Sequence, residues 1–193
     1  QIGRASVQAT HTVNQLLSLA RAEGGGASVP QQACDMVRLV SDVLQDSLPR
    51  AMDKGLDLGY EGVDAGTPGA CVQGNPTLLK EMVRNLVENA IHYTPCTPEH
   101  PGVVTVRVLV DPYSKALVMQ VEDNGLGIPL AERDLVFQPF YRALGTNVDG
   151  SGLGLPIVRE IAQQHGASVS VDAAFPNQTP PGACFTLRFN TPS

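Results

Sequence analysis

The chain contains no tryptophan, and aromatic residues make up only 5% of its 193 residues. No apolar run reaches the ~20 residues that cross a membrane, and no signal peptide opens the chain, so we expect a soluble protein without membrane contact. Positive charge is also scarce, because 13 Lys and Arg residues stand against 19 Asp and Glu residues. The resulting net charge of -6 argues against nucleic acid as a partner, but not against a nucleotide bound at one locally favourable site.

Cysteine is sparse and scattered. The four cysteines are Cys34, Cys71, Cys96 and Cys184. They form no C-x-x-C pair and have no matching histidine spacing, so neither a zinc site nor a disulfide framework is indicated, and a reducing, cytoplasmic setting is favoured. With 42% hydrophobic residues, the chain can bury one sizeable core.

The chain divides into an appendage, residues 1–26, and one domain, residues 27–193. Residues 1–23 have apolar positions at helical spacing, and Gly24 to Gly26 ends this pattern. The predicted helix begins without a cap or an initiator Met, so we interpret it as the remnant of a longer helix.

The next stretch predicts a helix and two strands. A helix is expected from Pro30, which suits a first turn, to about residue 51. Its predicted buried stripe consists of Val37, Val40, Val43, Leu44 and Leu48. Strands are expected over 56–60 and 70–73, paired with each other across a Gly-rich connection.

A well-marked helix follows, because Asn75 suits a cap and Pro76 a first helical position. Its apolar side is formed by Leu79, Met82, Val83, Leu86, Val87 and Ala90. On another face stand Glu81, Asn85, Asn89 and His92, at helical spacing. Asn is a poor residue inside a helix, and amide and carboxylate oxygens suit magnesium. A solvated polar face is the alternative.

Strands over 103–110 and 116–122 should form an antiparallel hairpin that leads to a short loop, Asp123 to Pro129. Gly125 and Gly127 allow the backbone to turn closely against whatever the Asp123 carboxylate holds. A buried Asp would accept a hydrogen bond from the amine edge of a flat ligand. An ordinary turn is the alternative, whereas a calcium loop is excluded because Gly125 replaces an oxygen ligand.

Residues 131–137 suggest a short helix, and Phe137 and Phe140 are expected to anchor the segment that follows. The composition of residues 145–150 is that of a mobile lid. Arg142 stands where it could reach a phosphate, although a solvated Arg is the alternative.

The run Gly150-Ser151-Gly152-Leu153-Gly154-Leu155-Pro156 opens a helix that ends at Gly166. Glycines before a helix expose backbone N–H groups, and the helix dipole adds positive potential, so this start predicts an anion site. The P-loop, dinucleotide and nucleophile-elbow motifs do not fit the run. Strands over 167–173 and 183–189 close the chain.

In this order, the four motifs resemble those of the sensor histidine kinase catalytic domain. That domain belongs to the ATPase superfamily that also includes gyrase, heat-shock chaperone and mismatch-repair ATPases. The family's N, G1, F and G2 boxes correspond to residues 81–95, 123–127, 137–142 and 150–155. The resemblance covers residues 27–190, and residues 14–21 resemble the end of the second helix of a kinase dimerisation domain.

The resemblance implies a two-layer α/β sandwich, in which three helices cover one face of a mixed, largely antiparallel sheet. It implies that Asp123 binds the adenine amino group, that Tyr93 lines the base pocket, and that Asn85 and Asn89 serve magnesium and the phosphates of ATP. The other implied ATP-binding residues are His92, Gly125, Gly127, Ile128, Arg142, Gly150, Ser151, Gly152, Leu153, Gly154 and Leu155. His92 departs from the pattern, because many relatives carry Lys or Arg there.

The implied reaction transfers the γ-phosphoryl group of ATP to a histidine of the parent's own dimerisation domain, for relay to a response regulator. The implied parent is a homodimer anchored in the bacterial inner membrane. Two alternatives are a hydrolytic ATPase, in which Glu81 would activate water, and an inert nucleotide-binding module.

Overall fold

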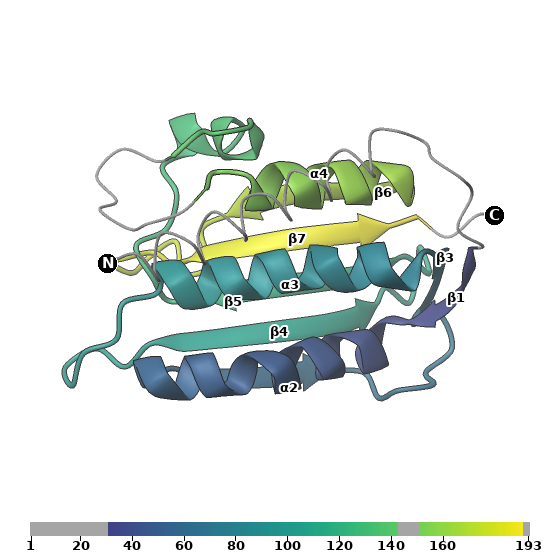
Figure 1. Ribbon diagram of the computed structural model, residues 1–193, viewed down its shortest axis with the longest axis horizontal. Helices are drawn as coiled ribbons and strands as arrows, with labels where there is room; N and C mark the ends of the chain where they lie inside the picture. The colour runs from purple at the N-terminus through teal and green to yellow at the C-terminus, as the bar shows by residue number, and fades with distance from the viewer. Residues whose placement is uncertain (1–30, 143–150, 191–193) are drawn as a thin grey trace, which may run out of the picture.

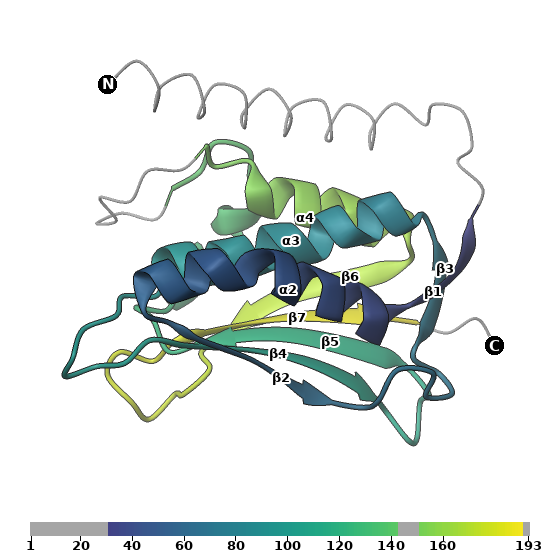
Figure 2. The same ribbon diagram turned by 60° about the horizontal axis from the view of Figure 1, so that its bottom comes forward.

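Three helices lie on one face of a five-stranded sheet in the computed structural model of the chain, which describes residues 31–142 and 151–190 (Figures 1 and 2). The helices are α2 (Met36–Lys54), α3 (Pro76–Tyr93) and α4 (Gly154–Gln164). This arrangement confirms the expected two-layer sandwich. The helix expected over residues 1–23 and the lid expected over 145–150 lie outside the described residues.

The sheet is mixed, with the strand order β2-β4-β5-β7-β6. Its strands are β2 (Asp57–Gly62), β4 (Val103–Val110), β5 (Leu117–Asp123), β6 (Ala167–Asp172) and β7 (Ala183–Phe189). The β2–β4 pair is parallel, and the other pairs are antiparallel. The expected β4–β5 hairpin is confirmed. Within it Asp123, the last residue of the central strand β5, lies opposite Val104 on one side and Ala183 on the other.

The core lies between the helices and the sheet, and its pattern follows from strand alternation. Every second residue of β5 and β7 is buried, whereas the residues between them are partly exposed. All six apolar positions expected on α3 are buried, as are the inward residues of α4. The largest fully buried side chains include Leu79, Met82, Leu86, Leu117, Met119, Ile157, Ile161 and Leu187. No helix within the described ranges is long and apolar enough to span a membrane.

The expected start of the second helix was wrong. Residues 32–35 form strand β1 (Gln32–Asp35), and α2 begins only at Met36. Asp35 is the reason, because its Oδ1 accepts the N–H groups of Val37 at 2.9 Å and Arg38 at 3.2 Å as an N-cap. On the expected stripe of this helix, Leu48 is 41% exposed.

The expected pairing of the next two strands was also wrong. β3 (Cys71–Gly74) pairs with β1 in a separate two-stranded sheet. β2 instead lies parallel to β4, from which α3 separates it in the chain. Such a helical crossover is what permits parallel neighbours, and sequence spacing alone does not reveal it.

Residues 130–137 form two 3₁₀ turns, Leu130–Glu132 and Leu135–Phe137, in place of the single short helix that was expected. Phe137 is buried as expected, edge-on to Phe185 with ring centroids 6.3 Å apart. Phe140 is not an anchor, because its side chain is 67% exposed. Its φ of 64° turns the chain sharply and carries the ring away from the core.

Candidate functional site

Three element ends meet at one end of the sandwich: the last turn of α3, the loop that follows β5, and the first turn of α4. In both ribbon views the N-terminal end of α4 lies beside the C-terminal half of α3, and β5 ends near the last turn of α3 (Figures 1 and 2). Packing of α4 on α3 holds the helices in this arrangement. The C-terminal half of α3, the Asp123 loop and the described part of the glycine-rich start of α4 therefore lie in one region.

Asp123 is a buried carboxylate at the end of a central strand, only 6% exposed. Its Oδ1 accepts the N–H of Gly125 at 2.9 Å. Burial raises the pKa of Asp123 to about 6, although hydrogen bonds from the backbones of Gly125 and Ala183 oppose this rise. Glu122 next to it adds a smaller upward contribution to the pKa. A buried acceptor of this kind suits a ligand that brings its own donor.

The glycines of the Asp123 loop are required by close approaches. A Cβ on Gly125 would lie 2.8 Å from the Asp123 Oδ1 and 3.1 Å from the Tyr93 carbonyl oxygen. Gly127 has a φ of 74°, and a Cβ there would lie 2.8 Å from the Gly182 oxygen. The Gly182 N–H in turn donates to the Gly125 oxygen at 3.1 Å. The loop is thus packed between the end of α3 and the segment that precedes β7.

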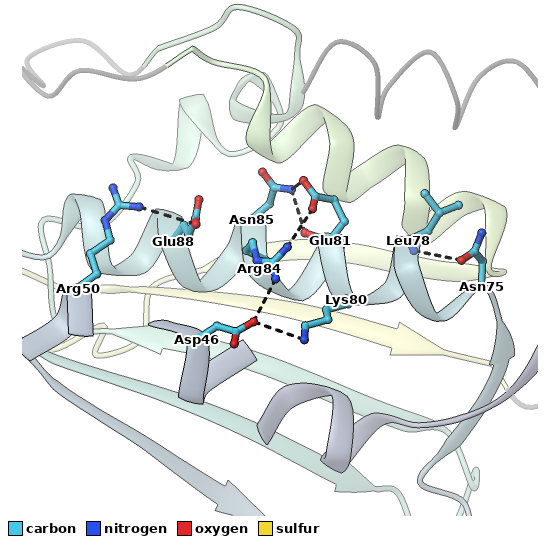
Figure 3. Close-up of polar contacts among 9 residues, drawn as sticks. All are labelled: Asp46, Arg50, Asn75, Leu78, Lys80, Glu81, Arg84, Asn85 and Glu88. Atoms are coloured by element: carbon cyan, nitrogen blue, oxygen red, sulfur yellow. Dashed lines mark hydrogen bonds and ion pairs between the residues drawn. The ribbon is translucent and has the colours of Figure 1, made fainter. Parts of the chain in front are cut away.

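The polar face of α3 is largely withdrawn from solvent. Asn85 is 5% exposed, and its Nδ2 donates to the Glu81 carbonyl oxygen at 2.9 Å and to Glu81 Oε1 at 3.3 Å (Figure 3). Glu81, Asn89 and His92 are half-buried. A freely solvated face, the alternative considered from sequence, does not describe Asn85. Its carboxamide oxygen is of the type that a hard cation binds.

The last turn of α3 is held by a lysine that sequence reasoning missed. Lys54, the last residue of α2, donates from Nζ to the carbonyl oxygens of Ile91 at 2.7 Å and His92 at 2.8 Å. Burial lowers the pKa of Lys54. The His92 and Tyr93 rings meet edge-on, with centroids 5.0 Å apart. A cation at the negative end of the α3 dipole therefore fixes the turn that carries both rings.

The first turn of α4 has the character of an anion site. Ser151 Oγ accepts the Leu153 N–H at 3.2 Å, and no described side chain caps the helix itself. The N–H groups of Gly154 and Leu155 belong to this first turn, where a helix has no internal acceptor for them. Gly152 has a φ of 69°, and its carbonyl oxygen accepts the Phe140 N–H at 2.9 Å.

The remaining expected residues differ in how closely they join this region. Ile128 packs partly buried against the core. Arg142 is exposed at the edge of the described chain, and Gly150 lies outside the described residues. No local motif predicts the contacts of Gly182 and Lys54, because each residue binds a segment distant in sequence: Gly182 binds the Asp123 loop, and Lys54 binds the end of α3.

The comparisons with known proteins agree with one another. A family model described as histidine kinase-, DNA gyrase B-, and HSP90-like ATPase matches residues 74–193. The chain is 37% identical over 175 residues to the signal transduction histidine-protein kinase/phosphatase MprB of Mycobacterium sp. (strain KMS), covering 90% of this chain. It is 33% identical over 137 residues to the sensor protein kinase PmrB of Pseudomonas aeruginosa, covering 71% of this chain.

Solved structures support the same assignment. The structure of the mycobacterial sensor histidine kinase MprB superposes with a TM-score of 0.69 at 30% identity, covering 82% of this chain and 96% of that one. The catalytic domain of the histidine kinase ThkA has the same fold, with a TM-score of 0.67 at 22% identity. The superposition covers 86% of this chain and 100% of that one. The chain spans only 31% of the full length of the MprB relative and 26% of PmrB.

Replacing Asp123 by Asn should stabilise the fold. A pKa of about 6 against the usual 3.8 means that keeping this carboxylate ionised at pH 7 costs about 3 kcal/mol of folding free energy. Asn keeps an acceptor for the Gly125 N–H and carries no charge, so we expect the free energy of unfolding at pH 7 to rise by about 1–3 kcal/mol. Urea denaturation of the wild type and Asp123→Asn measures this difference.

The effect of Asp123→Asn on stability should depend on pH. Because the pKa of Asp123 is higher in the folded than in the unfolded chain, its stabilising contribution is present below about pH 4 and is lost as the pH rises through about 6. The advantage of Asp123→Asn should therefore shrink toward pH 4. An advantage that stays constant from pH 4 to 8 would contradict the assignment of a raised pKa to this carboxyl.

Proposed function

The chain belongs to the family of histidine kinase-, DNA gyrase B- and HSP90-like ATPases, and we propose that it is the ATP-binding catalytic domain of a sensor histidine kinase. The observation that carries this proposal is the buried Asp123 carboxylate, clamped between the last turn of α3 and Gly182. An ATPase of this family needs a hydrogen-bond acceptor that distinguishes adenine from other nucleobases. The proposed role of Asp123 is to accept a hydrogen bond from the adenine amino group.

The adenine pocket is assigned to the Asp123 loop and the end of α3. Gly125 and Gly127 allow the loop to lie against the end of α3 and the Gly182 backbone, because a side chain at either position would collide with atoms there. Tyr93 and Ile128 are the residues assigned to line the pocket. Specificity comes from the carboxylate, since a base without the amino group would leave a desolvated acceptor unpaired.

The phosphates are assigned to α3 and to the start of α4. Asn85 and Asn89 offer carboxamide oxygens for magnesium, which prefers oxygen ligands and shares its shell with phosphates. Ser151, Gly152, Leu153, Gly154 and Leu155 form the helix start whose N–H groups and dipole attract phosphate oxygens. His92 and Arg142 are the side chains assigned to additional phosphate contacts.

The proposed reaction is transfer of the γ-phosphoryl group to a histidine supplied by the kinase dimerisation domain. The residues of this chain bind the adenine base, orient the phosphates and place oxygen ligands for magnesium. The nitrogen of the acceptor histidine can then approach the γ-phosphorus in line. Magnesium, when bound, neutralises charge on the phosphates. The dimerisation domain, to which residues 1–26 are assigned as a remnant, a cognate response regulator and a membrane-anchored parent are part of the proposal.

Hydrolysis of ATP is the second candidate, because Glu81 precedes Asn85 by one helical turn, as a water-activating base would. The carboxylate of Glu81 is already engaged, since Oε1 accepts from Asn85 at 3.3 Å and Oε2 lies 3.5 Å from Arg84 Nη1. These contacts favour a role in holding Asn85 over a role as base. We therefore place transfer to histidine first.

Magnesium-dependent binding of ATP and ADP is the first expected result. Isothermal titration of this chain with ADP should give a dissociation constant that tightens when magnesium is added, because the carboxamides of α3 and the phosphates share the ion. Asp123→Asn is the matched variant, and it should weaken ADP roughly 10- to 100-fold, through loss of a charge-assisted hydrogen bond worth about 1.5–3 kcal/mol.

The same variant separates binding from folding, because it is expected to be at least as stable as the wild type. Circular dichroism supplies that control. If neither nucleotide gives a measurable heat at millimolar concentration, the proposed function is wrong. If the variant binds as tightly as the wild type, only the adenine assignment is wrong.

A second expected result is that this chain labels a partner and not itself. Its sequence holds no run like the family's His-Glu-x-Arg-Thr-Pro acceptor, and two of its four histidines are poor substitutes on structural grounds. His92 is half-buried against Tyr93. Both ring nitrogens of His165 are engaged, since Nδ1 donates to the Ile161 oxygen at 2.7 Å and Nε2 accepts the Asn75 N–H at 3.1 Å.

The measurement is incubation with γ-labelled ATP, with and without a separately supplied sensor kinase dimerisation domain, followed by a test for acid-labile label. We expect slow labelling of the added domain, because transfer without tethering loses a large effective molarity. A phosphohistidine formed on this chain alone would contradict the placement of the acceptor. Steady release of phosphate without any labelled protein would favour the hydrolase.

A further inference from the structure

We propose that Arg84 is a positioning residue for the magnesium and phosphate site, which it serves by linking Glu81 of α3 to Asp46 of α2 and thereby fixing the Asn85 carboxamide. The inference rests on the proposed function, because it concerns the same Asn85. Apart from its place next to Asn85 in the chain, the Arg84 side chain is connected to this site through Glu81. Figure 3 shows the side chains concerned.

The orientation of the Asn85 carboxamide is dictated by its two neighbours. Both are acceptors: the Glu81 carbonyl oxygen at 2.9 Å and Glu81 Oε1 at 3.3 Å. The nitrogen must therefore face them, because the flipped carboxamide would place oxygen against oxygen. With Nδ2 turned to Glu81, Oδ1 points away from Glu81, as Figure 3 shows. The backbone carbonyl accepts the shorter bond and the Glu81 side chain supplies the second contact, so the position of that side chain sets part of the orientation of a proposed cation ligand.

Arg84 holds that side chain. Its Nη1 lies 3.5 Å from Glu81 Oε2, so the two oxygens of Glu81 are divided between Arg84 and Asn85. The other arm, Nη2, donates to Asp46 Oδ2 at 3.2 Å. The guanidinium fork therefore spans two carboxylates from two helices, which an ammonium group cannot do with the same fixed geometry. Lys80, 3.4 Å from the same Asp46 oxygen, steadies the far end of this link.

The link is too exposed to matter much for stability. The side chains of Arg84 and Asp46 are 37% and 53% exposed, and exposed ion pairs contribute little to folding. Their geometry is nevertheless directional, since each bond constrains the next along the sequence Asp46, Arg84, Glu81, Asn85. A mutation at Arg84 should therefore change the placement of Asn85 more than it changes the fold.

A matched control lies one helical turn further along the same pair of helices. Arg50 of α2 is 3.8 Å from Glu88 of α3, so this ion pair also joins the two helices across their outer surface (Figure 3). This pair is separate from the hydrogen bonds between Asn85 and Glu81, and Arg50 is assigned no role at the site. Arg50→Ala removes an interhelical ion pair of the same kind without touching the Glu81 link.

The experiment measures ADP affinity by calorimetry, with magnesium and with chelator, for wild type, Arg84→Ala, Arg84→Lys and Arg50→Ala. For Arg84→Ala we expect the affinity in magnesium to fall roughly 3- to 10-fold, while the affinity in chelator stays within about twofold. Arg84→Lys should recover only part of the loss. Arg50→Ala should match the wild type in both conditions, and thermal unfolding should differ little between the two Ala variants.

A double-mutant cycle tests whether Arg84 acts through Glu81. In a Glu81→Ala background, adding Arg84→Ala should have no further effect on affinity in magnesium, because the contact that transmits it is gone. Equal behaviour of Arg84→Ala and Arg50→Ala, or fully additive losses in the cycle, would overturn the inference while leaving the proposed function intact. A wild type that binds no nucleotide would remove the proposed function itself.

Discussion

Burying the Asp123 carboxylate, which is 6% exposed at the end of a central strand, costs desolvation free energy, and the surrounding structure partly compensates for that cost. Two backbone N–H groups, from Gly125 and Ala183, supply part of what water would otherwise provide. They can do so only because glycine at 125, 127 and 182 lets the loop, the end of α3 and the approach to β7 come into contact. The pKa of about 6 shows that the compensation is incomplete. A ligand with an amine edge would complete it.

The sheet and the helices position the end of the sandwich that carries Asp123. The five-stranded sheet fixes Asp123 between Val104 and Ala183, and the buried faces of α3 and α4 fix the helices above it. Lys54 then binds the last carbonyl groups of α3, and the backbone carbonyl and side chain of Glu81 both accept hydrogen bonds from Asn85 in the middle of the same helix. Under the proposed function, three different requirements meet here: an acceptor for the adenine base, oxygen ligands for a cation, and backbone donors for phosphates.

Sequence patterns predicted what depends on local chemistry. The Asn75 cap was correct because its side chain accepts from Thr77 and Leu78 in the first turn, and the apolar spacing of α3 predicted the whole buried face. The β4–β5 hairpin was equally accessible, since its strands are neighbours in the chain.

What sequence could not give depends on distant partners. The pairing of β3 with β1, and the parallel pairing of β2 with β4, depend on which strand edges the core leaves open. The nearness of β2 and β3 in the sequence therefore led to the wrong prediction that they pair with each other. Phe140 was taken for a core residue from its type, yet a φ of 64° carries it outward. At the candidate site, the motifs named Asp123 and Asn85, whereas Lys54 and Gly182 act across long sequence separations and carry no local signal. The link from Arg84 to Asp46 of α2 is likewise distant in sequence, although the contact of Arg84 with Glu81 is local.

The central claim is that the nucleotide binds where α3, the Asp123 loop and the start of α4 meet. Backbone amide NMR of this chain, titrated with ADP and magnesium, tests it most directly. We expect the largest shifts among residues 85–94, 123–128 and 151–155, with little change at Arg107, Gln120 and Arg188 on the face of the sheet away from the helices. Shifts concentrated on that face of the sheet, or around β1 and β3, would contradict the account.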